Sequence, residues 1–114
     1  LAKATPLVGV KDQRTEAVPK SFKLGQNFPN PFNPTTAIIY QLPADRHVIL
    51  KFSDMLGREV ATLVNERIKP GTYTVNWNAT RMASGVYFYR LEASQTDGAH
   101  PASFTETRKL VLVK

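Results

Sequence analysis

Cysteine is absent from this sequence of 114 residues, which excludes both a disulfide framework and a thiolate metal site. The chain also lacks any apolar stretch long enough to cross a bilayer, so we expect no transmembrane segment. Its two histidines, His47 and His100, stand far apart, without the spacing of metal ligands. Packing of apolar side chains must therefore hold the fold together, and we expect no metal and no cofactor.

Residue patterns typical of enzymes are missing as well. No serine lies in a nucleophile elbow or triad-like context, and no glycine-rich loop could cradle a phosphate. Asp54 and Glu59 flank a turn signal, where capping and solvation explain them better than paired-carboxylate catalysis. The sequence predicts no catalytic residues and a protein that is not an enzyme.

Acidic residues are scarce relative to basic ones. The chain carries 15 Lys and Arg against 9 Asp and Glu, a formal net charge of +6 with a pI near 9.8. Such an excess is typical of proteins that bind nucleic acids or anionic surfaces. The basic residues, however, are spread singly along the chain rather than gathered in a run. We therefore interpret them as a solvated surface and expect no nucleic-acid partner.

The beginning of the chain differs from the rest. Residues 1–20 mix charged and polar residues with two prolines and show little hydrophobic period, which indicates an extended linker. A single folded domain is expected over residues 21–114, a length that supports one hydrophobic core. Leu1 is not preceded by a charged and then apolar leader, so any export signal is expected upstream.

Helical period is absent over any three turns, whereas apolar and polar residues alternate over many short segments. Such alternation has the period of a half-buried strand. The first two expected strands should form a hairpin, and residues 65–69 a polar connection. The expected strands cover residues 35–42, 47–53, 58–64, 72–77, 85–92 and 104–114. About seven short strands with a turn every 8 to 12 residues indicate an all-β, immunoglobulin-like antiparallel sandwich, with an open-ended barrel as the alternative.

A proline-rich run precedes the first long strand. Pro29, Asn30 and Pro31 belong to this run, which covers residues 27–34. Each proline fixes φ, removes a backbone donor and keeps its predecessor out of the helical region. The run therefore excludes a helix or a central strand. It either only sets the path of the chain or forms a rigid, exposed recognition epitope.

Turn residues separate the later strands. Asp54 and Gly57 occupy the first and last positions of a type I turn signal. Gly71 and Gly85 each stand at the start of an expected strand, where a turn or bulge with positive φ favours glycine. A further reversal is predicted at residues 97–98.

Aromatic residues gather on two of the expected strands. Trp77 alternates with Tyr73 and Val75, and Tyr87 lies in the run that starts at residue 85. Such positions favour a core role for Trp77 and Tyr87. The alternative is an aromatic strip that stacks on sugar rings, for which Phe88, on the opposite face of its strand, is the better candidate.

Several segments in a fixed order carry a family resemblance. They are Asn-Phe-Pro-Asn-Pro-Phe-Asn-Pro at 27–34, Thr-Thr-Ala-Ile-Ile-Tyr-Gln-Leu-Pro at 35–43, Asp-Met-Leu-Gly-Arg-Glu-Val at 54–60, Gly-Thr-Tyr-Thr-Val-Asn-Trp at 71–77, Ser-Gly-Val-Tyr-Phe-Tyr-Arg-Leu at 84–91 and Lys-Leu-Val-Leu-Val-Lys at 109–114. Together they resemble the C-terminal sorting domain of the type IX (Por) secretion system of Bacteroidetes. The middle segments also look similar to the immunoglobulin-like domain of the flagellar hook-capping protein. A longer, more polar insert over 94–103 departs from the family pattern.

The resemblance implies a non-catalytic sorting or anchoring module at the end of a secreted passenger protein. Such a passenger crosses the periplasm and then the outer membrane, because the translocon recognises the module, and reaches the cell surface or the medium. A sortase-like protease commonly removes the domain, within residues 1–20 here, and leaves the passenger on anionic lipopolysaccharide. The rival hypothesis is a carbohydrate-binding or cell-attachment module of a surface enzyme.

The end of the last strand is apolar on both faces, which exceeds the need of a half-exposed edge. We predict that the translocon reads this segment, by strand addition and charge complementarity. The segment consists of Lys109, Leu110, Val111, Leu112, Val113 and Lys114. The alternative is that both faces are simply buried within the sandwich.

Overall fold

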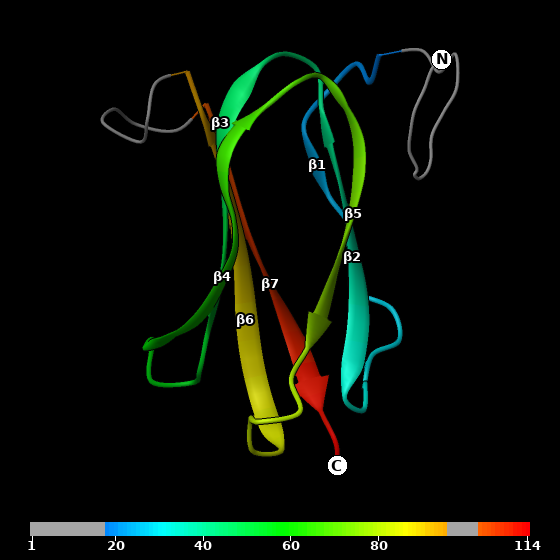
Figure 1. The fold of residues 1–114 in the computed structure, drawn as a ribbon, viewed down its shortest axis with the longest axis vertical. Helices are drawn as coiled ribbons and strands as arrows, with labels where there is room; N and C mark the ends of the chain where they lie inside the picture. Colours follow the sequence, from blue (N-terminus) through cyan, green and yellow to red (C-terminus); the bar gives the residue numbers. More distant parts are fainter. Residues whose placement is uncertain (1–17, 96–102) are drawn as a thin grey trace.

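Seven strands form two antiparallel sheets in the computed structural model, which describes residues 18–95 and 103–114 (Figure 1). The first sheet has the order β1-β2-β5 and contains β1 (Lys23–Leu24), β2 (Thr35–Leu42) and β5 (Gly71–Asn78). The second has the order β4-β3-β6-β7 and contains β4 (Glu59–Ile68), β3 (Arg46–Ser53), β6 (Gly85–Ser94) and β7 (Phe104–Leu112). The expected all-β antiparallel sandwich is confirmed, and the described residues contain no helix.

Alternating apolar residues place one side of each long strand in the core between the sheets. Ile38 on β2, Leu50 on β3 and Tyr89 on β6 are completely buried, while their neighbours along each strand are more exposed. This alternation follows from the pleat, which points successive side chains to opposite faces. The buried apolar core consists of Leu24, Phe32, Ile38, Tyr40, Leu42, Val48, Leu50, Phe52, Val64, Trp77, Ala79, Tyr87, Tyr89, Leu91, Ala93, Leu110 and Leu112.

The expected hairpin between the first two long strands is wrong. β2 pairs with β1 and β5, whereas β3 pairs with β4 and β6 in the other sheet. β2 already has a neighbour on each side, β1 and β5, which leaves no free edge along which β3 could pair. The short connection instead carries the chain across the core to the opposite sheet.

The expected polar connection over residues 65–69 is also wrong for most of its length. β4 continues to Ile68, and its residues Asn65, Glu66 and Arg67 pair with Ile49, Val48 and His47. An outer strand has one paired side and solvent around it, so polar side chains are tolerated there. The last strand, in contrast, ends at Leu112 rather than at residue 114.

The turn between β3 and β4 joins two strands of one sheet. The Gly57 N–H donates to the Asp54 carbonyl oxygen over 3.0 Å, and the Asp54 Oδ1 atom accepts from the N–H groups of Leu56 and Arg58 over 2.9 and 3.0 Å. The hydrogen bond from the Arg58 N–H is the main cause that lowers the pKa of Asp54. Gly57 has a φ of 84°, a left-handed conformation that favours glycine.

The predicted reversal at residues 97–98 and His100 lie outside the described residues, as do residues 1–17 of the expected linker.

Candidate recognition site

The end of β7 points alternate side chains into and out of the sandwich. Leu110 and Leu112 are buried in the core, Val111 is half-buried, and Val113 is 51% exposed. The alternative that both faces are buried within the sandwich is therefore wrong for Val113. A partner could reach Lys109, Val111 and Val113 without disturbing the core.

A stretch before β2 covers the outer edge of this strand; we call residues 26–34 the proline segment. The Phe32 N–H donates to the Val111 carbonyl oxygen, and the Val113 N–H donates to the Phe32 carbonyl oxygen, both over 2.9 Å. The Asn30 Oδ1 atom accepts from the Val111 N–H over 3.0 Å, and the Gln26 Nε2 atom donates to the Lys109 carbonyl oxygen over 3.0 Å. Four of the backbone groups that strand addition would need thus already have partners within the chain: the Lys109 C=O, the N–H and C=O of Val111, and the Val113 N–H.

Asn27 holds the proline segment in place from inside. Its side chain is 2% exposed, and its Nδ2 atom donates to the Pro29 carbonyl oxygen over 3.1 Å and to Thr36 Oγ1 over 3.0 Å. The Thr36 hydroxyl in turn donates to the Pro29 carbonyl oxygen over 2.9 Å. Buried polar groups that are mutually satisfied fix a loop in one conformation. The proline segment is therefore built into the body of the domain, with Pro31 between two residues that bond to β7.

Lys114 lies beside the loop that precedes β6. Its Nζ atom donates to the carbonyl oxygens of Thr80 and Met82 over 2.5 and 2.8 Å, and its N–H donates to Ser84 Oγ over 2.9 Å. The loop therefore holds the ammonium group, although Lys114 stays exposed. Lys109 is exposed as well, and it contributes its positive charge directly to the surface.

The outward side of β6 and β7 forms a patch of apolar and basic side chains. Val86 lies opposite Val111, and Phe88 lies opposite Lys109 in the antiparallel register. Val86, Phe88 and Val111 are each half-buried. Together with the exposed Val113, they make a surface that one macromolecular partner can contact. We call Val86, Phe88, Lys109, Val111 and Val113 the outer patch.

Trp77 and Tyr87 lie in the core. Trp77 is 5% exposed, and its ring centroid lies 4.3 Å from Phe52 and 5.9 Å from Phe32. Tyr87 is 7% exposed and meets Trp77 edge to face at 5.8 Å, and its hydroxyl donates to the Ala83 carbonyl oxygen over 2.6 Å. Both rings are almost fully buried, so they do not form an exposed strip for stacking on sugars.

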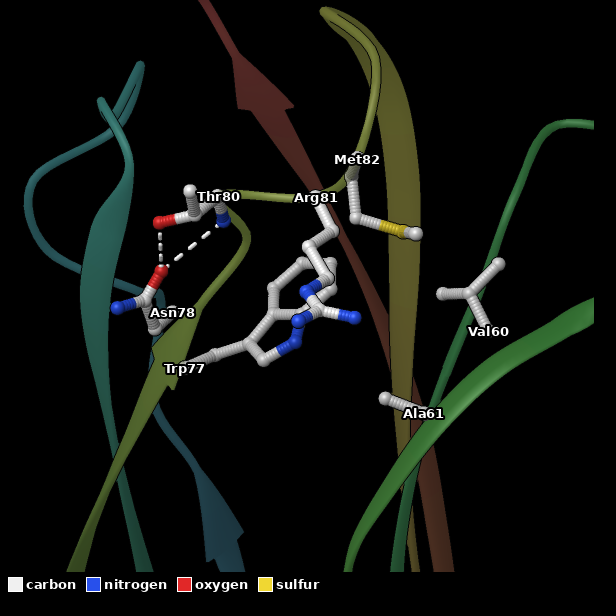
Figure 2. A pocket seen from close by; sticks show the side chains of 7 residues that line it. All are labelled: Val60, Ala61, Trp77, Asn78, Thr80, Arg81 and Met82. Carbon is white, nitrogen blue, oxygen red and sulfur yellow. Dashed lines mark hydrogen bonds between the residues drawn. The ribbon is translucent and has the colours of Figure 1, made fainter.

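An open hollow lies beside Trp77, between the start of β4 and the residues after β5. It has a volume of about 420 Å³, and its lining includes Val60 and Ala61 from β4 together with Arg81 and Met82 (Figure 2). The residues described in the structure contain no group of His, Cys, Asp or Glu side chains that could hold a metal ion. Among the same residues, no helix is long and apolar enough to cross a membrane.

The remaining glycines from the sequence lie at strand starts. Gly71 begins β5 with a φ of 153°, and Gly85 begins β6 with a φ of 154°. A Cβ atom at residue 71 would lie 3.3 Å from the Tyr73 hydroxyl, whereas one at residue 85 would meet nothing within 4 Å. Both positions shape turns at the ends of the sandwich, and Gly85 directly precedes Val86 of the outer patch.

Sequence reasoning missed the residues that join the proline segment to β7. Gln26, Asn27 and Phe32 received no assigned role, and Asn30 was given only a place in the run. Their partners lie 81 to 83 residues away in the cases of Asn30 and Gln26. One signal was available, since Phe32 is an aromatic residue amid prolines and asparagines and therefore a candidate for burial.

Fold and surface together define a class of protein: a small all-β module whose terminal strand is fastened to its body and presents an outward patch. The chain belongs to the secretion system C-terminal sorting domain family, because the model of that family matches residues 26–100. This family carries type IX secretion signals, so the resemblance seen in the sequence is confirmed. The match ends before β7 begins. Neither a curated protein nor a solved structure is significantly similar to the chain.

Proposed function

We propose that this domain directs a passenger protein through the type IX translocon of the bacterial outer membrane to the cell surface or the medium. The match to the sorting-domain family over residues 26–100 carries the proposal. Residues 1–20 link the passenger to the domain, which covers residues 21–114. The passenger passes through the periplasm on its way, and the domain itself performs no catalysis.

The translocon, in this proposal, reads the outer patch rather than a free strand edge. Two observations support this choice. The proline segment occupies the edge of β7 at Lys109, Val111 and Val113, so a partner strand would first have to displace it. Val113 and Lys109 nevertheless leave their side chains exposed, and these can contact apolar and acidic groups of a carrier.

Later steps follow from the same role. We propose that a sortase-like protease of the secretion machinery cuts within residues 1–20 and attaches the passenger to anionic lipopolysaccharide. The carbohydrate-binding alternative is less well supported, because Trp77 and Tyr87 are buried against other core rings and Phe88 is half-buried. A sugar-binding strip needs open ring faces.

A secretion experiment with surface substitutions tests the proposal. A reporter with an inner-membrane export signal, fused ahead of this domain, is produced in a bacterium with an active type IX system. The wild-type fusion is expected in the medium or on the surface, and the doubly substituted Lys109→Glu, Val113→Glu fusion in the periplasm. Lys23→Glu, which repeats the Lys-to-Glu reversal at an exposed residue of β1, serves as the control and is expected to be exported.

Deletion of the last residues is a poorer test, because Leu110 and Leu112 belong to the core and their loss would unfold the domain. Export of the reporter without the domain would refute the sorting role. Full export of the Lys109→Glu, Val113→Glu fusion would leave the sorting role standing but would refute recognition through the outer patch.

A further inference from the structure

The strands at the edges of the two sheets differ in how well they are protected from pairing with other chains. β1 is only two residues long, and the proline segment covers β7. β4 carries Glu59, Glu66 and Arg67 and has two irregularities in its register with β3. Charges, bulges and short length are the usual protection of an edge. β5 has eight residues without any charge or proline, so its edge is open.

The direction of the hydrogen bonds shows which groups of β5 are available. The Ala79 N–H donates to the Pro34 carbonyl oxygen over 2.8 Å, toward β2. Because N–H and C=O groups alternate in direction along a strand, the odd-numbered residues of β5 also face β2. The even-numbered residues Thr72, Thr74 and Asn76 therefore direct their backbone groups away from the sheet. The described part of the chain provides no backbone partner for these three residues.

A strand added beside β5 would also cover the side of β4 that faces the first sheet. The first sheet has three strands and the second has four, so β4 has no full-length strand across from it; Figure 1 shows β4 and β5 diverging below their shared connection. Of the residues of β4, only Val64 is buried. The hollow between Val60, Trp77 and Met82 opens on this side (Figure 2). An apolar side chain of an added strand would fill it.

Charge favours a foreign strand over a second copy of this chain. Arg81 is exposed at the rim of the hollow, and its guanidinium group has no carboxylate partner within the described residues. Two copies of a chain with a net charge of +6 would repel each other. A carboxylate on the incoming strand would instead pair with Arg81.

We propose that β5 binds an extended segment of an acidic partner protein, which adds as the fourth strand of the first sheet. Backbone groups of Thr72, Thr74 and Asn76 pair with the segment, an apolar side chain enters the hollow beside Trp77, and a carboxylate contacts Arg81. This site lies on a different sheet from the outer patch, so it goes beyond the sorting role and stands without it.

A synthetic peptide tests the proposal on the purified 114-residue chain. The probe has nine residues that alternate valine and threonine, with a central leucine and one glutamate near each end. Trp77 is the single tryptophan and lines the hollow, so its emission is expected to shift when the peptide binds. Amide signals of Thr72, Thr74 and Asn76 should shift as well, while those of β7 should not. The same peptide with N-methyl groups on alternate residues cannot form a ladder and is expected not to bind.

Matched variants locate the site. Thr74→Pro removes an outward N–H without breaking the ladder to β2 and should weaken binding by about tenfold or more, while Thr74→Val keeps the donor and should bind as the wild type does. Arg81→Gln should weaken binding several-fold. Circular dichroism checks that Thr74→Pro folds; if it does not, the N-methylated peptide decides.

The proposal fails if the peptide does not bind at millimolar concentration, or if it binds equally well after N-methylation. It also fails if sedimentation shows that the chain forms a dimer that Thr74→Pro abolishes, because β5 would then pair with a second copy of the chain.

Discussion

Trp77 is the residue through which the two sheets share most of their aromatic packing. Its ring contacts Phe32 from the proline segment, Phe52 from β3 and Tyr87 from β6. A side chain with partners from three separate segments cannot be removed without leaving a cavity, because those segments are held by their own strands.

Trp77→Ala is therefore expected to lower the free energy of unfolding by about 3 to 5 kcal/mol. Chemical denaturation followed by far-ultraviolet circular dichroism measures the change, since the variant has no tryptophan to report it. Met55→Ala is the control, because Met55 is 69% exposed and its truncation should change stability by less than about 0.5 kcal/mol. Equal stability of the two variants would contradict the core role of Trp77.

Buried tyrosines make stability depend on alkaline pH. Burial raises the pKa of Tyr89 to about 12 and also raises the pKa values of Tyr40 and Tyr73 above their ordinary value. The folded state therefore binds these phenolic protons more tightly than the unfolded chain does. The resulting stabilisation is complete below pH of about 10, the ordinary tyrosine pKa, and is lost as pH rises through the folded values.

We expect a free energy of unfolding that stays level for these groups near neutral pH and declines above pH of about 10. Denaturant titrations at pH values from neutral to strongly alkaline measure it. Tyr89→Phe should make the decline shallower. It should also cost about 1 kcal/mol at neutral pH, because the Tyr89 hydroxyl donates to the Gly25 carbonyl oxygen over 2.6 Å. An unchanged slope in this variant would show that Tyr89 does not take part.

At the scale of elements, the proline segment links the start of the domain to β7. Its residues Gln26, Asn30 and Phe32 all bond to β7 or its end. The buried Asn27 side chain holds the proline segment in one conformation by its hydrogen bonds to Pro29 and Thr36.

Asn27→Ala is expected to lower the free energy of unfolding by about 1 to 3 kcal/mol, because it leaves buried polar groups of its partners unsatisfied. The amide hydrogens of Val111 and Val113 should also exchange faster with solvent, because the proline segment would separate from β7 more often. Hydrogen exchange followed by nuclear magnetic resonance measures both the free energy of unfolding and the exchange rates of these two amides. Phe28→Ala, in the same segment but at a residue that is 79% exposed, should leave both quantities unchanged; faster exchange in that variant would contradict the role assigned to Asn27.

The strands themselves could be predicted from the sequence, but their partners could not. Alternation at Ile38 and Leu50 shows that each strand has one buried side, and this side faces the same core from either sheet. Period alone therefore does not distinguish a hairpin within one sheet from a crossing between two. The expected pairing of residues 35–42 with 47–53 failed for this reason. The polar end of β4 could not be predicted as a strand, because an edge strand is largely exposed and shows little alternation of apolar and polar residues.

The candidate site divides in the same way. The chemical character of residues 109–114 could be read directly, since Leu110 and Leu112 are apolar on one face and Val111 and Val113 on the other. What covers the backbone edge of this strand depends on Gln26 and Asn30, which lie more than 80 residues earlier. A single sequence carries no local signal for such distant hydrogen bonds.

For the molecule as a whole, the number of strands in each sheet sets where it is firmest. β3 and β6 lie inside the larger sheet with neighbours on both sides, and their inward residues are buried. β4 has one neighbour and is largely exposed. Local opening follows low burial and few neighbours.

Amide hydrogens of Ile49 and Glu92, which lie opposite each other on β3 and β6, are therefore expected to exchange only when the entire domain unfolds. Those in β4, such as Val64 and Glu66, should exchange about a hundredfold faster or more through local opening. Native-state hydrogen exchange at low denaturant concentration distinguishes the two groups, because only global opening responds strongly to denaturant. Identical free energies of exchange for β3 and β4 would contradict this picture.

The contact between the proline segment and β7 has a consequence for synthesis on the ribosome. The Phe32 carbonyl oxygen accepts a hydrogen bond from the Val113 N–H. The proline segment can therefore form its contacts only after β7 and Val113 have left the exit tunnel. Strands that join residues so far apart in sequence form late. We expect a nascent chain stalled before residue 109 to remain open to proteases, so that a product cut short by premature termination would be degraded rather than delivered.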